Sequence, residues 1–156
     1  MITGPVARAG PVIRELFVYL CVTDAVAAID FYVRVFGARE TFRLEDADGR
    51  VGHAELRFGP ATVMISDEHP EFGVVAPPAH GATGITLHLH VDDVDWLVRR
   101  AVDAGAVNLG GPTDHAHGER QCRVRDPYGH TWLLGQQIED LSNDEIERRY
   151  RALEER

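Results

Sequence analysis

The 156-residue sequence has few cysteines, no long apolar run and no excess of basic charge. Cys21 and Cys122 lie far apart in expected strands, which favours buried free thiols in a reducing cytoplasm over a disulfide framework. No apolar run is long enough to span a membrane, and residues 1–13 lack the apolar core of a signal peptide. A net charge of −9 provides no basic surface for phosphates. We therefore expect a cytoplasmic protein that binds neither nucleic acid nor a membrane.

Residues 85–91 alternate strictly between apolar and polar side chains, which predicts a β-strand. The polar face carries Thr86, His88 and His90. Imidazole titrates near neutral pH and serves as an acid, a base or a ligand, so this pattern indicates the wall of a cavity. Plain surface histidines are the alternative interpretation.

The chain contains the same pattern twice. Residues 14–23 alternate like residues 85–91, and each strand leads to a helical pattern that begins after an aspartate and ends at a glycine. The expected helices follow Asp24 in one half and Asp92 or Asp93 in the other. Three short strand patterns follow each helix. Two β-α-β-β-β copies at a period of about seventy residues indicate an internal duplication.

This duplication predicts an α+β fold of two tandem βαβββ modules, which form a curled mixed sheet around a cavity with the helices outside. We expect five segments in the chain: a flexible N-terminal arm at 1–13, the first module at 14–68, a linker loop at 69–83, the second module at 84–140 and a C-terminal helix at 141–156. Ser142 and Glu145 form a capping box at the start of that last helix.

The alternation of the strands also predicts which side chains line the cavity. Apolar residues such as Val18, Leu20, Leu56 and Leu87 should lie under the helices. The opposite face mixes aromatic and polar side chains, as is typical of a small-molecule pocket. These cavity-lining residues are Phe17, Tyr19, Cys21, His53, Glu55, Arg57, Thr86, His88 and His90.

Short motifs in both halves resemble those of the glyoxalase/bleomycin-resistance/dioxygenase superfamily, also called vicinal oxygen chelate. The motifs of the first module are residues 19–25, 28–32 and 36–38. Residues 52–56, 91–95, 118–120 and 126–132 are similar to the PhnB-like branch. The resemblance spans about residues 14–140 and implies this fold and a homodimer.

The resemblance also implies where a metal would bind. Carried over by position, the ligands of the superfamily's metalloenzymes fall at Phe17, Glu55, Thr86 and Leu133. Of these only Glu55 is a good ligand for zinc, nickel or iron. We therefore expect no metal and no other cofactor. A displaced site built from His88, His53 and Glu55 is an open alternative, whereas Asp114, His115 and His117 are expected to form a solvated loop.

Two functions remain open at this stage. The first is binding of a small drug-like or amphipathic molecule, with Phe17, Tyr19, Arg57, Thr86, His90, Arg120 and Leu133 as ligand-binding residues. The second is a lyase, isomerase or dioxygenase in which Glu55 is the general base and His88 or His53 the acid. Arg57 or Arg120 would then stabilise an oxyanion. Glu55 could instead form a plain ion pair with either arginine.

Overall fold

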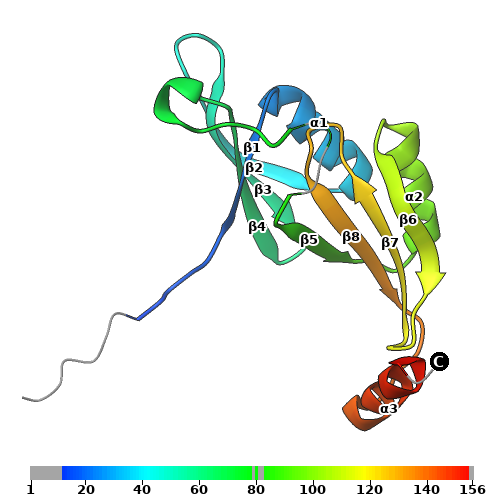
Figure 1. The fold of residues 1–156 in the computed structure, drawn as a ribbon. Helices are drawn as coiled ribbons and strands as arrows, with labels where there is room; N and C mark the ends of the chain where they lie inside the picture. The colour runs from blue at the N-terminus through cyan, green and yellow to red at the C-terminus, as the bar shows by residue number, and fades with distance from the viewer. Residues whose placement is uncertain (1–11, 79, 81–82, 155–156) are drawn as a thin grey trace, which may run out of the picture.

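The computed structural model describes residues 12–78, 80 and 83–154, which form two four-stranded mixed sheets (Figure 1). The first module comprises β1 (Val18–Val22), α1 (Ala25–Phe36), β2 (Arg39–Glu45), β3 (Val51–Phe58) and β4 (Ala61–Asp67). The second comprises β5 (Thr86–His90), α2 (Val94–Asp103), β6 (Val107–Asp114), β7 (Glu119–Arg125) and β8 (Thr131–Gln137). The short 3₁₀ helix η1 (Pro70–Phe72) lies between the modules, and α3 (Asn143–Glu154) follows them.

The two sheets have the same topology, β1-β4-β3-β2 and β5-β8-β7-β6. In each sheet the first and last strands of the module pair in parallel, and the other neighbours pair antiparallel. This repetition confirms the predicted α+β fold with tandem βαβββ modules. Most of residues 1–13 lie outside the described residues.

The local signals in the sequence account for where the helices begin and end. The Asp24 carboxylate accepts a hydrogen bond from the Ala27 amide at 2.9 Å, and Asp93 accepts one from Trp96 at 2.8 Å. Gly37 ends α1 in the left-handed region, with φ of 69°, which glycine adopts without strain. The second cap is therefore Asp93, not Asp92. No described helix is long and apolar enough to cross a membrane.

The predicted register of the strands matches the burial of their side chains. Leu20 and Leu56 are buried beneath the helices, and Leu87 and Leu89 are partly buried against the same core. Val18 is an exception, because it begins β1 and is 40% exposed instead of lying under α1.

One core joins the two modules. Helix α1 packs against α2, and Tyr32 and Phe36 of α1 contact the indole of Trp132 on β8, with ring centroids 5.5 and 4.7 Å apart. The Asp126 carboxylate, 3% exposed, accepts hydrogen bonds from the Tyr32 hydroxyl at 2.7 Å and the Trp132 indole at 2.8 Å. Burial raises the pKa of Tyr32 well above its usual range, and the charge of Asp126 adds to this.

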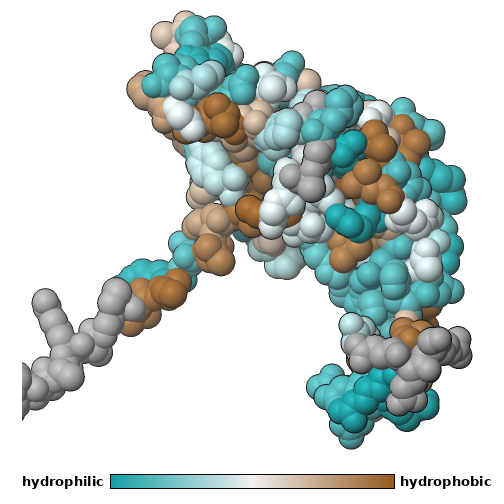
Figure 2. Space-filling model, in the orientation of Figure 1, coloured by the Kyte–Doolittle hydropathy of each residue, from teal (hydrophilic) through white to brown (hydrophobic). Residues whose placement is uncertain are grey.

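The faces of the sheets that the helices do not cover remain open. Figure 1 shows the N-terminal arm leading away from β1, and α3 standing beyond the ends of β6 and β8. Figure 2 shows apolar surface along the arm and where it joins the body. Ile13 and Leu16 of this arm are 87% and 92% exposed. A monomer therefore presents both open faces and an apolar arm.

Candidate functional site

Three predicted residues meet on the open face of the first sheet. The Tyr19 hydroxyl lies 3.0 Å from Nδ1 of His53, and Nε2 of His53 lies 3.6 Å from Oε1 of Glu55. Phe42 of β2 adds an aromatic ring 6.1 Å from the His53 ring. Tyr19, His53 and Glu55 thus bring a phenol, an imidazole and a carboxylate together on one face of the sheet. We call these three residues the first-module group.

A second polar group lies on the open face of the second sheet. Nε2 of His90 is 3.3 Å from Oε1 of Glu119, and Nε2 of His88 is 3.9 Å from Oε2 of the same carboxylate. The Gln121 amide donates a hydrogen bond to Oε2 of Glu119 at 2.7 Å. We call His88, His90 and Glu119 the second-module group.

In the second-module group the surroundings shift the pKa values of both His88 and Glu119 downward. Burial lowers the pKa of His88, and the neighbouring His90 lowers it further. Burial would by itself raise the pKa of Glu119. The hydrogen bond from Gln121 and the nearby imidazoles outweigh that effect, so its pKa lies below the usual range.

The sequence reasoning missed Glu119 and Gln121. Both lie on β7, where Cys122 and Val124 are buried under α2. Because side chains alternate along a strand, Glu119 and Gln121 belong to the opposite, open face. This alternation was the available signal, but Glu119 entered the prediction only within the motif 118–120 of the family resemblance.

Arg120 corrects one sequence-based expectation. Its guanidinium lies on the helix side of β7, where it bonds to Asp95 of α2 at 2.7 Å and to Asp114 at 2.6 Å. The alternation that exposes Glu119 turns Arg120 away from the open face. The prediction that Arg120 lines the cavity, pairs with Glu55 or stabilises an oxyanion there is therefore wrong.

The histidines also group differently from the prediction. Among the described residues, one group of three or more His, Cys, Asp or Glu side chains brings its donor atoms within 4.8 Å of one another, and it is the second-module group. His53 and Glu55 are not part of it, so a displaced metal site of His88, His53 and Glu55 is not formed. His117, expected in a solvated loop, brings Nε2 within 3.8 Å of Oε2 of Glu119.

A cavity of about 660 Å³ lies where the two modules meet. It is lined by the end of the N-terminal arm, the β3–β4 turn, the start of β4 and most of β5. Four predicted site residues are in this lining, namely Phe17, Arg57, Thr86 and His88. Trp132, which belongs to the shared core, forms part of its floor. Tyr19, Glu55, His90 and Leu133 do not line it, so the predicted site is divided between this cavity and the open faces.

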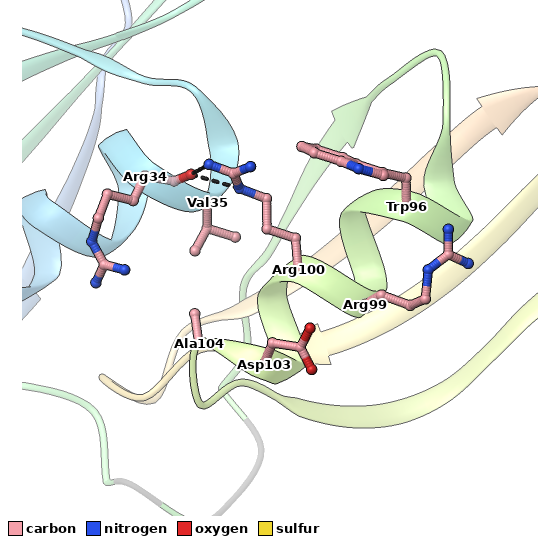
Figure 3. A pocket seen from close by; sticks show the side chains of 7 residues that line it. All are labelled: Arg34, Val35, Trp96, Arg99, Arg100, Asp103 and Ala104. Atoms are coloured by element: carbon pink, nitrogen blue, oxygen red, sulfur yellow. Dashed lines mark hydrogen bonds between the residues drawn. The ribbon is translucent and has the colours of Figure 1, made fainter.

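A second hollow, of about 500 Å³, lies on the opposite, helical side of the molecule (Figure 3). The Arg100 guanidinium donates two hydrogen bonds to the Arg34 carbonyl at the end of α1 and lies 4.9 Å from the Trp96 ring centroid. These contacts tie α1 to α2 and satisfy a carbonyl at a helix terminus. We therefore assign this hollow a packing role and place the candidate site on the sheet side.

The chain belongs to the Glyoxalase/Bleomycin resistance protein/Dioxygenase superfamily, whose family model matches residues 14–134. This confirms the resemblance in the sequence, while membership of the PhnB-like branch stays a prediction. The uncharacterized protein Rv0887c of Mycobacterium tuberculosis is 42% identical over 132 residues, which is 83% of this chain and 78% of that protein.

Solved structures agree with the family assignment. TioX from Micromonospora sp. ML1 is 34% identical, with a TM-score of 0.62 over 80% of this chain and 99% of TioX. The fosfomycin resistance protein FosX from Listeria monocytogenes, complexed with Mn(II) and sulfate, is 14% identical, with a TM-score of 0.63 over 86% of this chain and 98% of FosX. The likeness to FosX concerns the fold alone.

The residues at the superfamily's usual metal positions do not fit a metal. Phe17 and Leu133 offer only hydrocarbon, and Thr86 offers a neutral hydroxyl. Glu55 alone is a carboxylate, and transition-metal sites in proteins take three or four nitrogen, sulfur or carboxylate ligands. Together these four side chains supply one good metal ligand, which is too few to hold a transition-metal ion.

Proposed function

We propose that the protein binds a small amphipathic, drug-like organic molecule in the cavity between the two modules. The observation that carries this proposal is the lining, in which Phe17 and Trp132 provide aromatic surface beside Arg57, Thr86 and His88. Its volume of about 660 Å³ is within the range of sites that bury a small organic ligand. The aromatic walls would bury the apolar part of the ligand, and the polar side chains would orient its heteroatoms.

The assembly in which we propose this binding is a two-fold homodimer in the cytoplasm. Support comes from the apolar side chains that a monomer leaves in water: Ile13 and Leu16 on the arm, Phe42 on the open face of β2 and Tyr150 on α3. Ile13 and Leu16 are near neighbours on the arm, and exposed apolar patches often mark an interface, while open sheet edges are usually covered. A second copy would cover the open faces and enclose the cavity further.

Filling the cavity tests the binding proposal. A library of cationic, neutral and anionic aromatic amphiphiles is screened by thermal shift, and hits are titrated by calorimetry. Replacing Thr86, which lines the cavity, by Phe should weaken binding of a hit at least about tenfold, or ~1.4 kcal/mol. Thr41→Phe is the matched control, because Thr41 is exposed on β2 outside the cavity. Equal affinity of both variants for the hit would refute the assignment of the cavity.

The first-module group supports a second candidate, an acid–base enzyme. The chain Tyr19–His53–Glu55 offers a carboxylate base next to an imidazole that can return the proton. Of the two acids predicted for Glu55, His53 lies beside it, whereas His88 belongs to the second-module group. The reaction class would be proton abstraction and return, as in an isomerase or lyase.

The two candidates differ in what a Glu55→Gln substitution does to a bound compound. An enzyme would lose turnover by about 10²- to 10⁴-fold, the usual contribution of a general base, while binding stayed intact. A binding protein would leave the compound unchanged with either residue. His53→Gln tests the same chain of groups, since it keeps a polar side chain but cannot transfer a proton at neutral pH.

A further inference from the structure

We infer that His88, His90 and Glu119 form a site for a divalent first-row transition-metal ion of the zinc class, with His117 as a fourth ligand. None of these residues lies at the four positions of the superfamily's usual metal site. The inference is independent of the proposed ligand-binding function, and it departs from the sequence-based expectation that the protein holds no metal.

The donor atoms converge from three segments of the second module. His88 and His90 project from the open face of β5, Glu119 from the start of β7, and His117 from the loop before it. The three donors of the second-module group lie within 4.8 Å of one another. Nε2 of His90 is 3.3 Å and Nε2 of His117 is 3.8 Å from an oxygen of Glu119.

Small adjustments would complete the coordination. Ligands bound at 2.0–2.1 Å in a tetrahedron are roughly 3.3 Å apart, so the His90–Glu119 pair already has that spacing. His88, at 3.9 Å from the carboxylate, needs to approach it by less than about 1 Å. His117 lies 3.8 Å from the carboxylate but outside the set of donors within 4.8 Å of one another, so it needs a larger movement to become the fourth ligand. Exposed imidazoles make such shifts by rotating about their side-chain bonds.

The backbone leaves room for this convergence at Gly135. Gly135 of β8 lies between β5 and β7, paired with His90 on one side and Gln121 on the other. A Cβ at this position would lie 2.7 Å from Nε2 of His88 and 3.1 Å from Oε2 of Glu119. Any other residue would therefore push its side chain between the donors, whereas glycine leaves the space open.

Glu119 is also held in place from outside the group. Its side chain is 19% exposed, and the Gln121 amide donates to it at 2.7 Å. Hydrogen bonds of this kind orient metal ligands and raise their affinity. Two imidazoles with one carboxylate suit zinc and iron(II), whereas calcium and magnesium take oxygen ligands. His88 also lines the cavity between the modules, so a bound ion would lie close to the wall of that cavity that β5 forms.

Calorimetric titration of the untagged, chelator-stripped full chain with Zn²⁺ tests the inference. We expect one ion per chain, and visible absorption of the Co²⁺ form characteristic of few-coordinate nitrogen and oxygen ligation. His90→Ala should weaken Zn²⁺ binding at least 100-fold, and because the His90 side chain is 59% exposed, the fold should survive. Gln121→Ala should weaken it by about 10- to 100-fold through the loss of orientation.

Two further variants separate a built site from general binding by surface histidines. Gly135→Ala keeps every ligand but places a methyl group among them, and it should weaken Zn²⁺ binding as a ligand deletion does. His80→Ala removes an exposed histidine outside both groups and should leave the affinity unchanged. The inference is overturned if the unaltered chain binds no more tightly than His90→Ala, or if His80→Ala weakens binding equally. Melting curves of each metal-free variant verify that the fold is retained.

Discussion

The two modules share one architecture but carry different chemistry at matching positions. Counted back from the helix caps Asp24 and Asp93, Tyr19 occupies the place of His88. By the same count Cys21 occupies the place of His90. The first sheet thus pairs a phenol with an imidazole and a carboxylate, whereas the second gathers imidazoles around one carboxylate. The duplication provides a common framework. A few differences between matching open-face positions of the two modules decide what each half can bind.

The difference also depends on which strands contribute. His53 and Glu55 are two residues apart on β3, so their proximity follows from strand alternation alone. Glu119 reaches His90 only across β8, past a glycine. The His53–Glu55 pair is therefore local in sequence, but Tyr19 reaches His53 only across β4, as Glu119 reaches His90 across β8. The second-module group additionally requires the missing side chain of Gly135.

The largest expected effect tests whether the two modules form one cooperative unit. Asp126→Ala would leave the Tyr32 hydroxyl and the Trp132 indole, one from each module, without their buried acceptor. Each orphaned buried donor costs about 1–3 kcal/mol, so we expect a loss of about 3–5 kcal/mol in the free energy of unfolding. Urea denaturation measures this loss. Asp92→Ala, at an exposed position, is the control, and an equal effect there would contradict the role of Asp126.

The next effect compares the leucines under the two helices. Leu56 is completely buried, and Leu56→Ala should cost about 2–5 kcal/mol through lost transfer energy and the cavity left behind. Leu87 in the second module is only partly buried. A fully buried leucine at position 87 would cost the same, about 2–5 kcal/mol, so partial burial should reduce the cost of Leu87→Ala to about 1–2 kcal/mol.

His88→Ala provides the contrast on the opposite face of β5. It should cost much less stability than Leu87→Ala, because the His88 side chain is 38% exposed. Thermal denaturation of the three variants ranks them directly. A larger loss for His88→Ala than for Leu56→Ala would show that the faces are assigned wrongly.

Much of the fold follows from the sequence because its signals are local. Alternation identifies the buried Leu20 and Leu56, and Asp24 and Gly37 mark the ends of the first helix. The partnership of Asp126 with Tyr32 could not be read in this way, because the two residues are far apart in the chain and meet only when the modules pack.

The candidate site is less predictable for the same reason. Tyr19, His53 and Glu55 were identified from alternation, and the structure brings them together. Arg120 was placed on the wrong face, and Glu119 was not considered as a site residue. The alternation of buried and exposed side chains along β7 places Glu119 on the open face. Its contact with His90 depends on how β5, β8 and β7 pair, which the sequence does not reveal.

A smaller effect distinguishes the apolar arm from the outer face of α1. If two copies assemble through the arm and the open sheets, Ile13→Asp should raise the dissociation constant at least about tenfold, or ~1.4 kcal/mol. Val26, half exposed on α1, lies away from those surfaces, so Val26→Asp should leave the dimer intact. Light scattering over a micromolar dilution series reads the mass. A monomer mass for the unaltered chain would refute the dimer.

The smallest effect concerns the loop that leaves the first module, where η1 is anchored by a histidine. Nε2 of His69 lies 2.9 Å from Oδ2 of Asp46 in the β2–β3 turn, and Nδ1 lies 3.0 Å from the Asp67 carbonyl. The hydrogen bond to Asp46 raises the pKa of His69, although partial desolvation and the charge of Arg50 oppose this. Arg50 is itself engaged by Asp48 and Glu71.

A raised pKa in the folded chain fixes the sign of the pH dependence. The folded protein holds the His69 proton more tightly than the unfolded chain does, so this stabilisation is complete below the ordinary histidine pKa of about 6.5. It is lost as the pH rises through the pKa of the folded state. An NMR titration of the His69 imidazole should give a midpoint above the ordinary value, and Asp46→Asn should bring that midpoint down. An unshifted midpoint in the unaltered chain, or one that Asp46→Asn leaves in place, would show that the loop is held without this ion pair. The β8–α3 connection of the second module is held in that way, by an ion pair between Arg149 and Glu139 that includes no histidine.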